Sequence, residues 1–166
     1  MGDKGGMRIT RRMAKRFLIF AALLLLVIPR PFLILKDFKS QTSYAQIPIE
    51  RDTRFTVEWT HSVEKTPWRE TYVAGWPHGV KLIETSFRSY GAGVPADTGV
   101  ETKVVNGWIT AELSEQREQV IYLISRKDYK LIIGPKTIVL TKLVPRYTSL
   151  EITAAWRLWW WDLLIN

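Results

Sequence analysis

Residues 55–61 alternate between apolar and polar side chains, and this pattern constrains the fold more than any other feature of the sequence. Phe55, Val57, Trp59 and His61 fall on one face of an extended chain, and the residues between them fall on the other. Such a two-residue period is typical of a half-buried strand. The domain that contains it is therefore expected to be built from strands.

Further strand-like runs follow at short spacing, with turn signals such as Asn106-Gly107 and Gly134-Pro135 between several of them. They cover residues 69–74, 80–89, 104–110, 119–126, 130–133, 136–142 and 147–153. Only residues 112–118 hint at a helical turn. The pattern predicts a mainly β fold, either a compact antiparallel sandwich or a partly open barrel, after one N-terminal hydrophobic helix.

The chain begins with a basic cluster and an uninterrupted apolar run. Residues 1–16 hold six basic residues and one acidic residue, which supply +5 of the formal net charge of +8. Residues 17–28 (FLIFAALLLLVI) are all apolar. Because a basic cluster stays cytoplasmic while the chain beyond an apolar run is exported, we expect the body of the protein outside the cytoplasm.

The apolar run has two interpretations, a membrane anchor and a cleaved signal sequence. Its twelve residues would rise about 18 Å as a helix, short of the roughly 30 Å of a hydrocarbon core. Extension to residue 35 includes Arg30, whose side chain would reach the far interface. The small-x-small sequence Ser43-Tyr44-Ala45 lies seventeen residues past Ile28, which is long for signal peptidase. We therefore expect an uncleaved anchor, with a secreted or periplasmic product after cleavage as the alternative.

These features divide the chain into four parts. They are a basic cytoplasmic segment (1–16), a membrane anchor or signal sequence (17–35), a polar tether (36–54) and a β domain (55–166). Residues 47–166 carry a net formal charge of only +1, so nucleic acid is not an expected partner. The sequence has no cysteine, which excludes thiolate metal sites, cysteine nucleophiles and disulfides.

Polar and flexible residues gather after two of the expected strands, as they do at many binding sites. They are His61, Glu64, Lys65, Arg69 and Glu70, followed by Arg88, Tyr90, Gly91, Gly93 and Asp97. The glycines favour a turn with positive φ angles, and its backbone N–H groups would be accessible. We take these ten residues as the candidate binding site for a ligand or partner.

The segments WTHSVEKTPWRETY and ETSFRSYGAGVPAD resemble the paired motifs of a bacterial family, domain of unknown function 1850 (DUF1850). The resemblance covers roughly residues 55–107. It implies a small extracytoplasmic protein of the kind often encoded beside TAXI-type solute transporters of the tripartite ATP-independent periplasmic (TRAP) class. It implies a transport-associated role but no particular activity. Together with the expected N-terminal anchor, this places the protein in the bacterial inner (cytoplasmic) membrane, with its body on the extracytoplasmic side.

Metal binding and hydrolysis find little support in these residues. His61 and Glu64 are three apart, so on an extended chain they face opposite sides, and no third ligand is evident. Ser62 is adjacent to His61, but neighbouring side chains on a strand diverge and no orienting acid follows. We predict no metal, no cofactor and no catalytic residue. For His61 the alternative is a structural role, with its ring near Trp59 and one nitrogen bonded locally.

Arg69 and Arg88 form the more suggestive pair. If the strands that carry them pair antiparallel, their guanidinium groups approach one another and, with Lys65, suit a carboxylate on a small solute or on an acidic partner. The alternative is a structural network in which three glutamates neutralise these cations. The three are Glu64, Glu70 and Glu84.

The C-terminus is rich in tryptophan. Trp156, Trp159, Trp160 and two leucines recur at helical spacing, which predicts a short helix with one apolar stripe. That stripe either packs on the core of the domain or lies at a membrane or transporter interface, where tryptophan is favoured.

Three functions remain open. The first is a membrane-tethered extracytoplasmic accessory protein that binds a TRAP-type transporter or its substrate-binding protein. The second is a small organic-anion-binding module that uses the motif cations. The third, with the least support, is a hydrolytic or metal-dependent enzyme.

Overall fold

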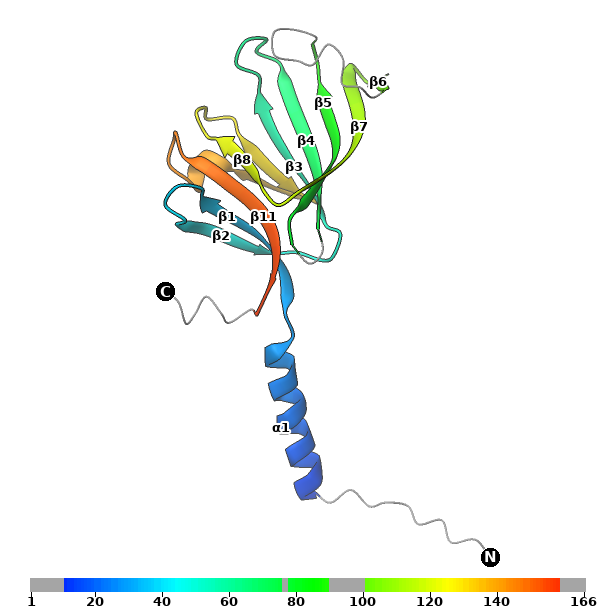
Figure 1. The fold of residues 1–166 in the computed structure, drawn as a ribbon, viewed down its shortest axis with the longest axis vertical. Coiled ribbons are helices and arrows are strands. Elements are labelled where there is room, and N and C mark those ends of the chain that lie inside the picture. The colour runs from blue at the N-terminus through cyan, green and yellow to red at the C-terminus, as the bar shows by residue number, and fades with distance from the viewer. Residues whose placement is uncertain (1–10, 76–77, 90–100, 159–166) are drawn as a thin grey trace, which may run out of the picture. The chain divides into compact units, whose positions relative to one another are not determined.

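The computed structural model describes residues 11–75, 78–89 and 101–158. These residues form one α-helix, eleven strands and a short 3-10 helix (Figure 1). The elements are α1 (Arg11–Val27), β1 (Arg30–Asp37), β2 (Ser43–Pro48), β3 (Arg54–Thr60), β4 (Pro67–Ala74), β5 (Val80–Phe87), β6 (Thr102–Val105), β7 (Trp108–Arg117), β8 (Val120–Leu123), β9 (Lys130–Ile133), β10 (Lys136–Val139), η1 (Leu140–Lys142) and β11 (Ser149–Arg157). The β domain spans Pro31–Trp156, and α1 belongs to a separate unit.

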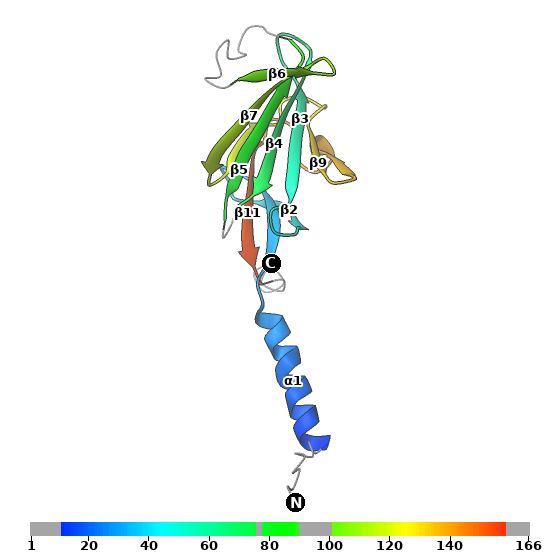
Figure 2. The same ribbon diagram turned by 90° about the vertical axis from the view of Figure 1, so that its right-hand side faces the viewer.

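Two antiparallel sheets make up the β domain. The smaller sheet has the order β2-β1-β11-β8, and the larger has the order β10-β9-β3-β4-β5-β7-β6. Figure 2 shows β3, β4, β5 and β7 of the larger sheet running alongside one another. The described strands do not close into a barrel. The predicted mainly β antiparallel sandwich is therefore confirmed.

A hydrophobic cluster of described residues joins the inner faces of both sheets. The smaller sheet contributes Leu33 and Leu35 from β1 and Leu150 and Ile152 from β11, all fully buried. The larger sheet contributes, among others, Phe55, Val57, Tyr72 and Leu131. The alternation predicted for β3 is confirmed, since Phe55 and Val57 are buried while Thr56 and Glu58 are partly exposed. Burial of apolar area on this scale is the main favourable term in folding.

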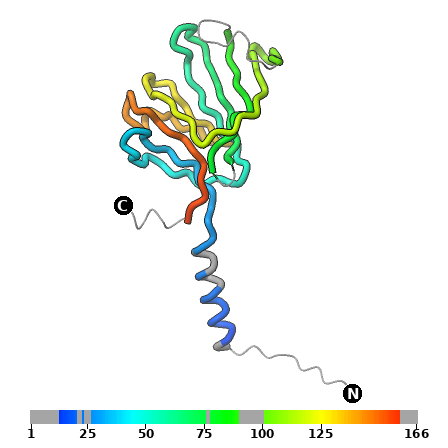
Figure 3. The backbone as a smooth tube through the Cα atoms, viewed as in Figure 1, coloured from blue at the N-terminus to red at the C-terminus, as the bar shows by residue number. Residues whose placement is uncertain are grey.

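Strand β11 connects the two sheets. It lies between β1 and β8 in the smaller sheet, and Figure 3 shows it alongside β1. At the corner that precedes β5, the Gly79 N–H donates to the Ala154 carbonyl over 2.8 Å, and His78 forms an isolated bridge with Ala155. Gly79 has φ +84°, and an added Cβ would lie 2.5 Å from the Arg117 carbonyl oxygen. Glycine is therefore required at this corner.

The structure differs from the sequence prediction over residues 30–54. The segment expected to extend an anchor to residue 35 and continue as a polar tether forms β1 and β2, which pair with Leu33 opposite Ile47. Pro29 and Pro31 disfavour a helix here. Residues 32–35 are all apolar because β1 is buried on both faces, with Ile34 only 2% exposed. A strand of this kind has no two-residue period, so its sequence is hard to distinguish from that of a buried helix.

Two predicted helical segments also differ. Residues 112–118, which hint at a helical turn, lie mostly in β7, whose polar end is exposed at the edge of the core. Trp156 lies in β11, which pairs with β8 and β1 in the smaller sheet, and this pairing keeps the chain extended. The predicted helix therefore does not begin at Trp156. Trp159 and Trp160 lie outside the described residues.

In the middle of helix α1, apolar side chains lie on all sides of the helix. Phe17, Leu18, Ile19 and Phe20 are four consecutive residues, and each exposes more than 60% of its surface. Since successive helical residues are about 100° apart, these four point in all directions. In the described part of the chain, no helix combines the length and the apolar character of a membrane span.

Candidate functional site

The residues predicted to form one site are divided between the two faces of the larger sheet. Side chains alternate along a strand, so Arg69 lies on the outer face of β4 and Glu70 on the inner face. The register places Arg69 opposite Glu58 on β3 and Glu70 opposite the buried Val57. His61, Glu64 and Lys65 lie in the loop between β3 and β4. Tyr90, Gly91, Gly93 and Asp97 lie outside the described residues.

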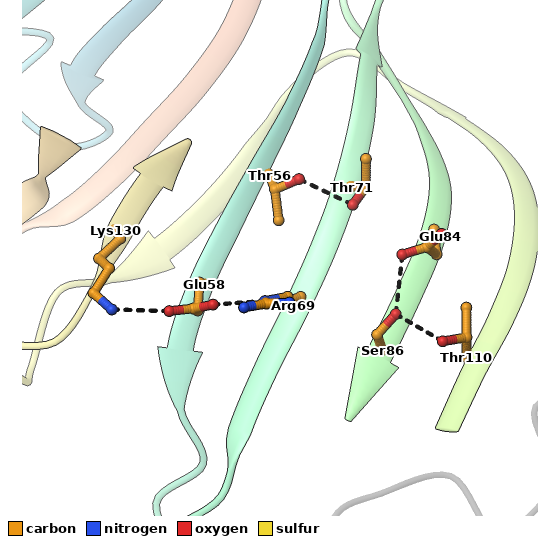
Figure 4. Close-up of polar contacts among 8 residues, drawn as sticks. All are labelled: Thr56, Glu58, Arg69, Thr71, Glu84, Ser86, Thr110 and Lys130. Carbon is orange, nitrogen blue, oxygen red and sulfur yellow. Dashed lines mark hydrogen bonds and ion pairs between the residues drawn. The ribbon is translucent and has the colours of Figure 1, made fainter. Parts of the chain in front are cut away.

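On the outer face, one carboxylate joins two cations (Figure 4). Glu58 accepts from Arg69 Nε at 2.6 Å through one oxygen and from Lys130 Nζ at 2.9 Å through the other. Its side chain is only 13% exposed. Burial raises the pKa of Glu58, but the hydrogen bonds from Lys130 and Arg69 outweigh burial and hold the pKa below 4.5. The carboxylate is therefore ionised at neutral pH and balances two cations.

Arg69 and Arg88 meet on the same aromatic ring. Their guanidinium carbons lie 4.1 Å and 4.8 Å from the centroid of the Trp108 ring, at the start of β7. The structure thus brings together the two arginines that the sequence places on paired strands. Arg88 is exposed and forms no ion pair with any described residue. Contacts of this kind hold a guanidinium in place and leave its N–H donors available.

The expected neutralising partners of these cations lie elsewhere. Glu84 accepts from Ser86 Oγ at 3.0 Å, on the same outer face (Figure 4). Glu64 accepts from Ser89 Oγ at 3.3 Å, and Glu70 lies on the inner face. The acidic partner of Arg69 is Glu58, which the sequence alone placed only on the outer side of its strand. Strand register determines which acidic residue lies opposite Arg69, and the alternation of side chains does not reveal the register.

The loop between β3 and β4 holds the His61 side chain in place. Its Nδ1 accepts from the Glu64 backbone N–H at 3.3 Å, and its ring stacks on Trp68 at a centroid distance of 5.5 Å. The local bond is the one expected, but the ring packs on Trp68 rather than Trp59, because Trp68 follows the loop on the neighbouring strand. Lys65 has φ +55°, and its Nζ donates to the Ser62 carbonyl. Lys65 makes no described contact with either arginine.

Aromatic rings form a continuous stack across the inner face. Trp59 lies between Tyr129 and Trp68, with centroid distances of 6.1 Å and 5.8 Å and interplanar angles of 9° and 15°. His61 continues the stack beyond Trp68 at 25°. The ring of Tyr122, from β8 of the other sheet, packs on Trp59 with a centroid distance of 5.5 Å. Only the alternation of Trp59 was apparent in the sequence, since the other rings depend on strand pairing.

A second inner-face cluster joins the two sheets through hydroxyl groups. Tyr72 and Tyr122 both donate to Glu70 Oε2, and their hydroxyls are 2.7 Å apart. Burial raises the pKa of both tyrosines, and the negative charge of Glu70 raises each pKa further. Both hydroxyls therefore remain protonated well above neutral pH and act as donors to the carboxylate.

Among the described residues, two cavities open on the inner face, and Trp59 lines both. The first has a volume of about 410 Å³ and lies between the β3–β4 loop and the connection from β8 to β9. The second, of about 360 Å³, is lined by the Glu70 cluster and Arg117. Among the described residues, no group of three His, Asp or Glu side chains is arranged to hold a metal ion. The first cavity is lined mainly by aromatic rings and polar side chains, and one cation, Arg126, is among them.

Comparison with known proteins gives a family and no activity. No curated protein matches the chain, and no solved structure matches it. The sequence model of one family, described as "Domain of unknown function (DUF1850)", matches residues 55–140, from β3 to the start of η1. This segment is more than half of the 166 residues and contains Glu58, Arg69, Arg88 and Trp108. The chain belongs to the DUF1850 family.

Proposed function

We propose that the protein is an extracytoplasmic accessory protein, tethered to the bacterial inner membrane, that binds an acidic segment of a TRAP-type transporter or its substrate-binding protein. The docking surface is the outer-face cluster of Arg69, Arg88 and Trp108. The transporter is the partner that the family resemblance implies. The cluster is the part of the proposal that rests on geometry.

The observation that carries the proposal is the pair of guanidinium groups on one indole ring. Arg69 is fixed by Glu58 at 2.6 Å, whereas Arg88 is exposed and unpaired among the described residues. An arginine held by a ring and lacking an acidic partner presents planar donors that match a carboxylate. A carboxylate on a partner would bind Arg88 without breaking the existing ion pair of Arg69.

Membrane tethering is supported by the N-terminal segment. The exposed apolar side chains of α1 would be costly in water, and the basic residues before them favour a cytoplasmic N-terminus. A reporter enzyme that is active only in the cytoplasm, fused after Asn166, is therefore expected to be silent. Full reporter activity would contradict export and the proposed role.

The docking surface is tested by arginine substitution in the full-length protein. Arg88→Ala is expected to abolish co-purification with a TRAP transporter subunit or its binding protein, identified by mass spectrometry from detergent-solubilised membranes. The melting temperature should hardly change, because no ion pair is lost. Arg54→Ala is the matched control, since Arg54 is an exposed arginine on the same sheet and has no described ion pair. Equal capture by both variants would contradict the docking surface, and absence of transporter components from the wild type would contradict the accessory role.

A second candidate function is a small organic-anion-binding module. The first inner-face cavity favours it, because that cavity is lined by an arginine and a histidine and by no acidic residue.

A further inference from the structure

The first inner-face cavity has the size and lining of a small-molecule site. Its volume of about 410 Å³ lies within the range of ligand pockets in proteins. Its lining includes Trp59, Trp68, Arg126 and Tyr129. It lies on the opposite face of the sheet from the proposed docking surface.

The stacked rings give the cavity a positively polarised wall. Both faces of Trp59 are covered, one by Trp68 and the other by Tyr129, so its ring presents an edge to the cavity. The edge of an aromatic ring carries the positive part of its quadrupole. Among the described residues, the indole N–H of Trp59 has no hydrogen-bond partner. A wall of this kind favours an acceptor or an anion over a cation.

Arg126 is held so that its terminal nitrogens remain available. Its Nε lies 3.4 Å from Asp128 Oδ1, and the other oxygen of Asp128 accepts from the Thr60 backbone N–H at 3.1 Å. The Nη atoms make no hydrogen bond within the described residues. This arrangement fixes the guanidinium through one nitrogen and leaves the other two as a bidentate donor pair.

His61 supplies a further donor. Because its Nδ1 accepts from the Glu64 backbone N–H, the proton of the neutral imidazole lies on Nε2. The hydroxyl groups of Ser62 and Ser125 also line the cavity. The lining therefore combines one permanent cation, one imidazole and several neutral donors, with no carboxylate among them.

We propose that this cavity binds a small organic monoanion, a carboxylate on a planar aromatic body. The carboxylate pairs with the Arg126 guanidinium and the His61 imidazole, and the planar body lies against the ring edges of Trp59 and Trp68. One guanidinium matches a single carboxylate, whereas a phosphate dianion would need more positive charge. The site is separate from the docking surface, so neither proposal depends on the other.

The test uses the full-length protein in detergent, with benzoate and phenylacetate as probes and benzamide as the uncharged control. Titration calorimetry is expected to show saturable binding of both carboxylates and at least ten-fold weaker binding of benzamide. Arg126→Ala should weaken carboxylate binding at least ten-fold. Lys127→Ala, which removes an exposed neighbouring cation that does not line the cavity, should change it less than two-fold.

Several results would overturn the site. They are no binding of either carboxylate, equal binding of benzamide, and unchanged affinity in a folded Arg126→Ala variant. If Arg126→Ala proves unfolded by its melting curve, His61→Ala replaces it and should weaken carboxylate binding at least three-fold. Loss of benzoate binding in Arg88→Ala but not in Arg126→Ala would place the anion site on the outer face. Because the Arg126→Ala variant is expected to capture the transporter normally, failure of this site is distinguishable from failure of the accessory role.

Discussion

The hydroxyl group of Tyr122 is expected to stabilise the domain by linking its two sheets. In Tyr122→Phe the ring keeps its contact with Trp59, but the chain loses the hydrogen bond that the Tyr122 hydroxyl donates to the Glu70 carboxylate. A hydrogen bond to a charged group contributes about 1.5–3 kcal/mol. Because Tyr72 still donates to Glu70, we expect a loss in that range. The melting temperature should fall by roughly 5–10 °C.

The same variant should change stability at alkaline pH. The unfolded tyrosines ionise near 10.0, whereas the folded pKa of Tyr72 and of Tyr122 is raised. Above pH 10 the unfolded chain therefore releases protons that the folded chain retains, and the free energy of unfolding falls as pH rises. Each such tyrosine contributes up to about 1.4 kcal/mol per pH unit. Tyr122→Phe removes one contribution, so stability should fall less steeply above pH 10.

Urea denaturation followed by tryptophan fluorescence, at pH 7 and at several values above pH 10, measures both effects. Tyr44→Phe is the matched control, because Tyr44 packs against the core and its hydroxyl has no described hydrogen bond. If Tyr122→Phe is no less stable than this control at neutral pH, the hydroxyl does not link the sheets. An unchanged alkaline slope would contradict the raised pKa.

Three further substitutions test other parts of the domain, each by urea denaturation. Gly79→Ala should lower the free energy of unfolding by roughly 1–3 kcal/mol or more, because φ +84° is strained for alanine and the added Cβ meets the Arg117 carbonyl. Unchanged stability would contradict the tight corner. Lys36→Met should lower the free energy of unfolding by about 3–5 kcal/mol, because the Glu151 carboxylate, only 3% exposed, then lacks the ammonium group that lies 3.2 Å away. Lys39→Met is the control, since Lys39 is exposed. Glu58→Gln should lower the free energy of unfolding by about 1–2 kcal/mol at pH 7 and leave it unchanged well below pH 4.5. The reason is that a carboxylate whose pKa is lowered in the folded protein contributes stability that is lost as pH falls. An equal loss at both pH values would contradict the ion pairs.

Local alternation was enough to predict the fold class and the faces of β3. Phe55 and Val57 are buried because the chain is extended there, and extension follows from neighbouring residues alone. The same reasoning failed at β1, where Ile34 is buried as well as Leu33 and Leu35, so no alternation was visible. It failed again at the polar end of β7, where partnership with β5 rather than propensity keeps the chain extended.

The candidate site was predictable only in part, because its geometry depends on register. Sequence reasoning could bring Arg69 and Arg88 onto adjacent strands, but it could not identify Trp108 as the ring between them. That contact requires the pairing of β5 with β7 and the irregularity after Leu82. Arg126 had no local signal, because its cavity forms only where the β8–β9 connection approaches the loop at His61.

The position of β1 beside β11 has a consequence for the order in which the domain folds. These two strands are the central pair of the smaller sheet, yet they lie at opposite ends of the domain sequence. The smaller sheet cannot assemble until residues near 157 have been synthesised, whereas β3, β4 and β5 pair between close neighbours in sequence. Contacts over long sequence separations are slow to form. The larger sheet is therefore expected to form first, and a nascent chain that lacks β11 would expose the inner face of that sheet until synthesis is complete.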